Sequence, residues 1–150
     1  MDQEPAPTTD GNRTEGERPA APFGQLDFLY TPSDDVPADV DWFTSVLGAR
    51  RLFAIDDGGV RVAMLELSEG PPRILLTDHL EGDASILVYR VDDLERTLAE
   101  LTGRGWQPGR RLEIPQGPCA SFRSPGGQRL AVYERSRPGV EAHFIGRFDF

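Results

Sequence analysis

Between residues 85 and 105, the spacing of apolar residues changes from that of a strand to that of a helix. Residues 86–91 form a short apolar run of the kind found in buried strands. Leu94, Leu98 and Leu101 then follow at i, i+4 and i+7, which places them on one face of a helix. The pattern predicts a strand that leads directly into an amphipathic helix, with Asp92 or Asp93 as its N-cap.

The same plan occurs earlier in the chain. Residues 25–31 carry apolar side chains on both faces of a predicted strand, and the Ser-Asp-Asp turn at 33–35 offers helix caps. Val40, Phe43 and Leu47 form the apolar stripe of the helix that follows, which we expect to end at Gly48.

After each strand–helix pair, the pattern predicts three further strands, joined by Gly-rich and Pro-rich turns. The predicted strands are 50–55, 60–67 and 74–77 after the first helix, and 110–114, 120–124 and 129–134 after the second. This predicts an α+β fold of two βαβββ modules, whose curled mixed sheet surrounds a concave cleft with the helices outside. The sequence leaves open whether the modules pair within one chain or across chains.

Three regions are expected. Residues 1–22 contain no large apolar residue after Met1, and we interpret them as a disordered tail. Residues 23–135 form the domain. Residues 136–150 carry Phe144, Phe148 and Phe150, so this extension is expected to pack on the domain or on another subunit.

The chain has a formal net charge of -9 and a single cysteine. An acidic chain without a basic run argues against nucleic acid and anionic membranes as partners. No apolar run is long enough to span a bilayer, and the N-terminus lacks the pattern of a signal peptide. With one cysteine no disulfide can form within the chain, so we expect a cytoplasmic protein.

Three motifs give the chain a family resemblance. They are WFTSVLGARRLF, VYRVDDL and SPGGQRLAVYE, and together with the element order they resemble the vicinal oxygen chelate superfamily. That superfamily includes glyoxalases, extradiol dioxygenases, epimerases and bleomycin-resistance proteins. The resemblance implies the fold described above, but one fold hosts many chemistries.

In metal-dependent members of the superfamily, His or Glu ligands project from the first, fourth, fifth and eighth strands. Matching the motifs puts Phe28, Leu75, Ile86 and Ala131 at these positions. All four are apolar and cannot ligate a divalent ion. The alternation of side chains along the first strand puts Asp27 on the face opposite to Phe28 and Tyr30. A slip of one residue would bring Asp27 to the first position, but one carboxylate does not make a site. We therefore expect no metal site and no cofactor.

Four further residues share the predicted faces of these positions. Counting along the strands in steps of two puts Tyr30, Thr77, Arg90 and Tyr133 toward the cleft. Apolar walls with a few polar groups suit a small organic ligand. The alternative is that the tyrosines are core residues and Arg90 is a paired rim residue. The candidate ligand-binding residues are Phe28, Tyr30, Leu75, Thr77, Ile86, Arg90, Ala131 and Tyr133.

Other reactive side chains have simpler interpretations. Cys119 has no basic neighbour in the sequence and is expected to be a buried thiol rather than a nucleophile. His79 lies in a polar linker and His143 in the C-terminal extension, and both are expected to be surface residues. Two Arg pairs, at 50–51 and 110–111, are interpreted as charges at strand edges.

Three functions remain open. The first is metal-free binding of a small, partly apolar molecule, as in resistance proteins of the superfamily. The second is a lyase or oxidoreductase with a displaced metal site, or an enzyme that uses Cys119. The third is a non-catalytic interaction module whose cleft is filled by its own side chains. A homodimer is expected from the family and from the apolar C-terminal stretch.

Overall fold

The structure is a computed structural model and describes residues 20–150. The predicted disorder of residues 1–22 therefore falls almost entirely outside the described residues. Within them, the order strand, helix and three strands occurs twice, and a short 3-10 helix follows. The predicted fold class, α+β with two βαβββ modules, is confirmed.

The elements match the predicted order along the chain. The first module comprises β1 (Leu26–Pro32), α2 (Val36–Ser45), β2 (Arg50–Asp57), β3 (Val60–Glu66) and β4 (Arg73–Thr77). The second comprises β5 (Ile86–Val91), α3 (Leu94–Gly103), β6 (Arg110–Ile114), β7 (Gly117–Arg123) and β8 (Arg129–Glu134), followed by η1 (Val140–His143). The N-caps are Asp35 for α2 and Asp93 for α3.

One strand starts earlier than predicted. β7 begins at Gly117 rather than Ala120, and Pro118 pairs with Glu113 of β6. The prediction stopped short because Gly and Pro are depleted in strands. Gly117 is required here, since a Cβ at this position would lie 2.0 Å from the carbonyl oxygen of Glu134.

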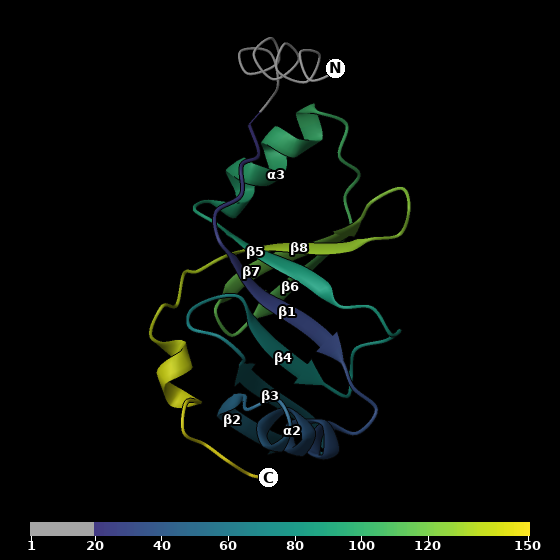
Figure 1. Cartoon of the computed structure of the whole chain (residues 1–150). Coiled ribbons are helices and arrows are strands. Elements are labelled where there is room, and N and C mark those ends of the chain that lie inside the picture. The colour runs from purple at the N-terminus through teal and green to yellow at the C-terminus, as the bar shows by residue number, and fades with distance from the viewer. Residues whose placement is uncertain (1–19) are drawn as a thin grey trace, which may run out of the picture.

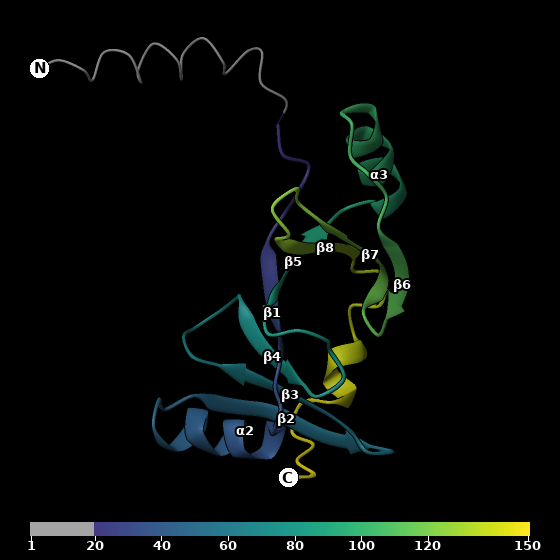
Figure 2. The same ribbon diagram turned by 90° about the vertical axis from the view of Figure 1, so that its right-hand side faces the viewer.

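All strands form one sheet of order β2-β3-β4-β1-β5-β8-β7-β6. β1 and β5 pair antiparallel at its centre, while β1–β4 and β5–β8 are parallel. The two modules therefore pair within one chain. The sheet curls into two half-sheets, β2-β3-β4-β1 from the first module and β5-β8-β7-β6 from the second. The helices α2 and α3 lie at opposite ends of the molecule on the outer sides (Figures 1 and 2). No helix within residues 20–150 is long and apolar enough to cross a membrane.

Each helix packs on its own half-sheet through a separate apolar cluster. Val36 and Val40 of α2 pack on β2, β3 and β4, while Leu94 and Leu98 of α3 pack on β7 and β8. Leu47, which was assigned to the first helical stripe, is 47% exposed, because α2 ends at Ser45.

A third cluster lies between the two half-sheets, and we call its surface the inner face. Its buried members come from both modules: Phe28, Leu52, Phe53, Ile55, Met64, Ile86, Val88, Cys119, Ala131 and Tyr133. The two halves of the molecule therefore share this core. Apolar side chains of the chain itself occupy the concave side of the sheet.

The C-terminal segment, residues 137–150, connects the rims of the two half-sheets. Its first residue, Arg137, donates hydrogen bonds to the carbonyl oxygens of Ile114 and Pro115 at the end of β6. Further along, backbone hydrogen bonds join it to β2, where Phe148 pairs with Ala54 in a parallel bridge. The segment runs along one side of the molecule from the second module to the first (Figure 2).

Candidate functional site

The positions that correspond to metal ligands lie together on the inner face. Phe28, Ile86 and Ala131 are buried members of its cluster, and Leu75 packs against it half-buried. They come from β1, β5, β8 and β4, the strands on which the family resemblance puts ligands. Among residues 20–150, no three His, Cys, Asp or Glu side chains come together as a potential metal site.

A polar group of side chains lies at one end of the inner face, where β1 begins and β8 ends. The Tyr133 hydroxyl donates a hydrogen bond of 2.5 Å to the Asp27 carboxylate. Arg90 Nε lies 3.5 Å from the same carboxylate. Burial, and then the hydrogen bond to Asp27, raise the pKa of the Tyr133 hydroxyl far above its usual range. Tyr133 therefore stays a neutral donor, and Asp27 is its acceptor.

Asp27 was predicted to face away from Phe28 and Tyr30, and this was wrong. The register of β1 against β5 shifts between Leu26 and Phe28, which marks a bulge. A bulge breaks the alternation of side chains, so Asp27 reaches Tyr133 on the inner face. Counting along the strand in steps of two could not place Asp27 on the inner face, because the sequence carries no clear mark of the bulge.

A second polar group lies at the other end, where β1 and β4 end. The Tyr30 hydroxyl lies 2.7 Å from His79 Nε2, and the Thr77 hydroxyl lies 2.5 Å from His79 Nδ1. Thr77 is fully buried, whereas His79 is exposed. Burial raises the pKa of Tyr30. Both nitrogens of the imidazole ring are thus engaged, which fixes its orientation.

The sequence interpretation of His79 was therefore incomplete. It is a surface residue, as predicted, but its ring is held by two of the candidate ligand-binding residues. The only signal in the sequence was its position two residues after Thr77, directly beyond the end of β4. His143, by contrast, lies exposed in η1.

Cys119 has the surroundings expected of a structural thiol. It is 3% exposed and belongs to the inner-face cluster. Burial raises the pKa of its thiol to about 11. The reactive thiolate is therefore scarce at neutral pH, and this position does not favour nucleophilic chemistry.

The C-terminal segment adds an aromatic ring to the inner face. Phe144 packs against the cluster, with its ring centroid 5.7 Å from that of Phe53. Beside it, Glu141 accepts a hydrogen bond from Gln116 and lies 3.7 Å from Arg135. Phe144 thus covers part of the surface to which the resemblance assigns a ligand.

A pocket of about 400 Å³ lies beside the Asp27–Arg90–Tyr133 group. Arg90 lines it together with the chain before β1 and the ends of β5 and β8; the other lining residues are Gly24, Gln25, Val91, Asp92, Glu134 and Arg135. Arg90 therefore links an open, mainly polar pocket to the buried Tyr133 hydroxyl. Of the eight candidate ligand-binding residues, Arg90 is the one that lines this pocket.

The vicinal oxygen chelate class of fold is defined by two βαβββ modules whose sheet curls around an inner face. In this class the ligand-equivalent positions lie on strands β1, β4, β5 and β8. The family description that matches residues 25–132 is the Glyoxalase/Bleomycin resistance protein/Dioxygenase superfamily, so this chain belongs to that superfamily. The predicted membership is confirmed.

Solved structures with the same fold include enzymes. Methylmalonyl-CoA epimerase from Mycobacterium tuberculosis is 19% identical, with a TM-score of 0.66 over 80% of this chain and 93% of its own. A hypothetical protein from Bacillus halodurans is also 19% identical, with a TM-score of 0.64 over 75% of this chain and 95% of its own.

A variant of the Streptomyces coelicolor methylmalonyl-CoA epimerase, in complex with 2-nitronate-propionyl-CoA, is 14% identical. Its TM-score is 0.61 over 77% of this chain and 96% of its own. At these identities the likeness concerns the fold. No curated protein matches the chain.

Proposed function

We propose that this chain is a metal-independent binding protein of the superfamily, which holds a small, partly apolar molecule at the inner face. The observation that carries the proposal is the set of apolar residues at the four ligand-equivalent positions, Phe28, Leu75, Ile86 and Ala131. A ligand that packs on them gains about 25 cal/mol per Å² of its own apolar surface removed from water.

The two polar groups would orient the ligand. At one end, Arg90 carries a positive charge at a partly open pocket, and Tyr133 donates to Asp27. At the other end, Tyr30, Thr77 and His79 form a hydrogen-bonded set. We infer that a carboxylate or carbonyl group of the ligand lies toward Arg90, because guanidinium groups bind such oxygens strongly.

Phe144 would control access. Its ring packs on the inner face from the C-terminal segment, which is tied down at both rims. Binding at the inner face then requires Phe144 to withdraw, or the ligand to enter from the Arg90 pocket. Replacing Phe144 with Ala is expected to strengthen binding, provided that the domain keeps its fold.

A second function is favoured by a specific observation. The inner face is covered by the chain's own side chains, including Phe144, which fits a non-catalytic interaction module. A cysteine-dependent enzyme has less support, because Cys119 is buried and its pKa is raised to about 11. The methylmalonyl-CoA epimerases share the fold at 14–19% identity, and a fold alone assigns no substrate.

The expected homodimer and the expected cytoplasmic location stay predictions. The sequence argument for a dimer is weakened, because Phe144 and Phe150 of the C-terminal segment pack on their own domain. Light scattering of the full chain at micromolar concentration measures the assembly directly, and a monomer there would contradict the dimer.

Thermal-shift screening of the full chain against small aromatic and aliphatic acids and amides tests the proposal. Binding to the native state raises the melting temperature. The proposal expects such hits, and it expects Ala131→Glu to abolish those that bind at the inner face, because Ala131 is 4% exposed within the inner-face cluster. Ala38→Glu, at an exposed position of α2, is the matched control and should keep them. A screen without hits would favour the interaction module.

Ala131→Glu should also destabilise the fold by roughly 3 kcal/mol near neutral pH, because a buried carboxylate without a partner loses its hydration. Burial raises the pKa of the new carboxyl above its unfolded value. The lost stability should therefore return as the pH falls through the folded-state pKa. Urea unfolding at several pH values measures this. Equal stability of Ala131→Glu and Ala38→Glu would mean that position 131 is not enclosed.

A further inference from the structure

A pocket of about 320 Å³ lies outside the inner face, between α3 and the outer strands of the second half-sheet. Its lining includes Leu98 and Ala99 of α3, Trp106 and Gly109 of the following loop, Arg111 of β6 and Ala120 of β7. It is separate from the site of the proposed function, because it lies on the opposite side of the sheet. We propose that it binds a small aromatic molecule that carries a carboxylate or carbonyl oxygen.

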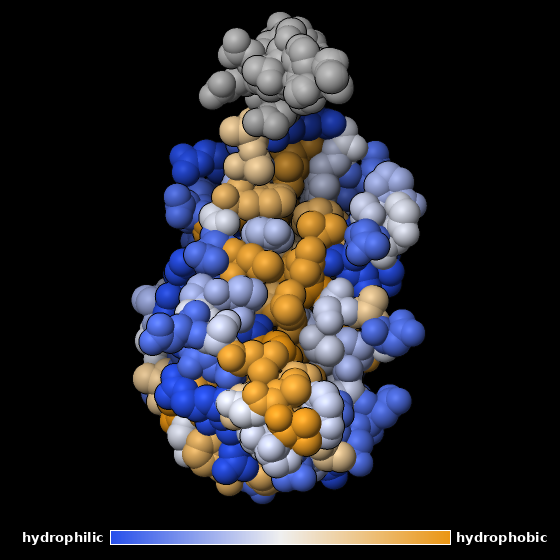
Figure 3. Space-filling model, in the orientation of Figure 1, coloured by the Kyte–Doolittle hydropathy of each residue, from blue (hydrophilic) through white to orange (hydrophobic). Residues whose placement is uncertain are grey.

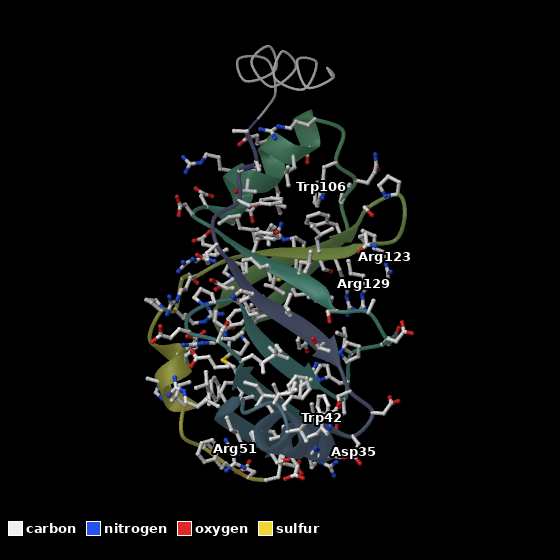
Figure 4. All side chains as sticks on the ribbon, in the orientation of Figure 1. Asp35, Trp42, Arg51, Trp106, Arg123 and Arg129 are labelled. Carbon is white, nitrogen blue, oxygen red and sulfur yellow. The ribbon has the colours of Figure 1, made fainter. Side chains whose placement is uncertain are left out.

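One residue of the pocket lining, Trp106, carries an unused hydrogen-bond donor. The indole nitrogen Nε1 of Trp106 is buried and has no hydrogen-bond partner within the described chain. Buried donors are normally paired, so an unpaired one needs an explanation. The ring is held against Phe122 in an edge-to-face contact, with centroids 5.5 Å apart, and it lies between α3 and the sheet (Figure 4). Solvent does not reach this atom in the structure, so the ring must shift slightly on binding before an acceptor oxygen in the pocket can satisfy the N–H group.

The walls of the pocket suit an aromatic ring. Leu98 and Ala120 are buried, and with Ala99 and the Trp106 ring they give the pocket mainly apolar walls. Gly109 lets the loop approach β7 closely, since a Cβ there would lie 1.9 Å from the carbonyl oxygen of Ser121. Apolar walls beside an unpartnered donor suit a ring that carries an acceptor.

A cation, Arg111, lies at the rim of the pocket. Arg111 lies 2.5 Å from the Glu95 carboxylate, and the side chains are 52% and 74% exposed. Such an exposed pair contributes little to stability and exchanges readily with solvent. The carboxylate of a ligand could therefore replace Glu95 as the partner of Arg111 while its ring occupies the pocket.

Nuclear magnetic resonance of the ¹⁵N-labelled full chain tests the proposal. The chain has two Trp residues and hence two indole N–H signals, which Trp42→Phe assigns. The probe is phenylacetate up to about 10 mM, which detects millimolar affinity. Benzylammonium has the same ring without an acceptor oxygen and is the matched probe. We expect a saturable shift of the Trp106 signal with phenylacetate, and at least ten-fold weaker binding of benzylammonium.

Two variants fill the pocket from the helix. Ala99 and Thr102 both line it from exposed positions, so Ala99→Phe and Thr102→Phe are each expected to weaken phenylacetate binding at least ten-fold. Ala38→Phe, on the exposed side of α2, should leave it unchanged. The proposal is overturned if phenylacetate causes no saturable shift of the Trp106 signal. It is also overturned if benzylammonium binds equally well, or if binding persists in both filled variants.

Discussion

The two modules have the same order of elements, but their outer edges are completed differently. In the first, the C-terminal segment pairs with the edge strand β2, and Phe150 packs on the cluster under α2. In the second, the edge strand β6 has no further strand beside it in the described chain, and a pocket lies between α3 and β6. A repeated unit therefore does not imply repeated surfaces, because a short added segment decides which edge is covered.

The large apolar side chains that stay exposed lie mostly in the first module, although the C-terminal segment covers part of it. Phe148 is 46% exposed, but its ring lies 4.1 Å from the Arg51 guanidinium, so the segment also covers charged parts of β2. Hydrophobic residues form a stripe across one face of the molecule from the second module down to α2 (Figure 3). Trp42, which is 50% exposed and lies on α2, belongs to the apolar surface that the segment leaves uncovered.

Removing residues 144–150 should have the largest effect on stability, because these residues complete the edge of the first module. The deletion removes Phe144 from the inner face, Phe150 from the cluster under α2 and the backbone hydrogen bonds to β2. We expect a loss of about 3 kcal/mol or more, or a fall in melting temperature of roughly 6–12 °C by calorimetry. Removing residues 1–19 is the control, and its composition predicts no change. Similar melting temperatures for the two deletions would mean that the segment contributes little.

The Arg residues in second position on the two edge strands offer a finer test. Arg51 of β2 donates a hydrogen bond of 2.6 Å to the carbonyl oxygen of Phe150 and contacts the Phe148 ring. Arg111 of β6 pairs with the exposed Glu95. Arg51→Met should cost about 1 kcal/mol, because both contacts anchor the C-terminal segment. Arg111→Met should stay within about 0.5 kcal/mol. Equal costs in urea unfolding would contradict the asymmetry of the edges.

Cys119 gives the smallest expected effect. Because the thiol is buried and its pKa is raised to about 11, alkylation by iodoacetamide at pH 7.5 should be at least about ten-fold slower in the native chain than in urea. Mass spectrometry of the labelled protein measures both rates. Fast labelling of the native chain would return Cys119 to the list of possible nucleophiles.

The sequence predicted the fold well, because the signals that define it are local. Apolar spacing, helix caps and Gly-rich turns marked both modules, and the element order then implied the curled sheet. The ligand-equivalent residues were also predicted to share one face of the sheet, and Phe28, Ile86 and Ala131 lie together in the inner-face cluster. Period-two counting works wherever a strand is regular.

The parts that sequence reasoning missed depend on contacts between distant residues. Asp27 reaches Tyr133 because of a bulge in β1, and His79 is oriented by hydroxyl groups from β1 and β4. The route of the C-terminal segment also could not be read, since its apolar residues fit either the domain or a partner. The pocket under α3 depends on how the helix packs on the two strands that follow it, and the spacing of apolar residues does not encode this packing.

The most direct test of the proposed function is a binding titration of a thermal-shift hit under three conditions: as purified, with excess EDTA, and with added Mn²⁺ after EDTA is removed. Apolar residues at Phe28, Leu75, Ile86 and Ala131 predict the same affinity, within about two-fold, in all three. Ala131→Glu should lose binding in each. Binding that disappears with EDTA and returns with Mn²⁺ would contradict the account, because a metal would then be part of the site.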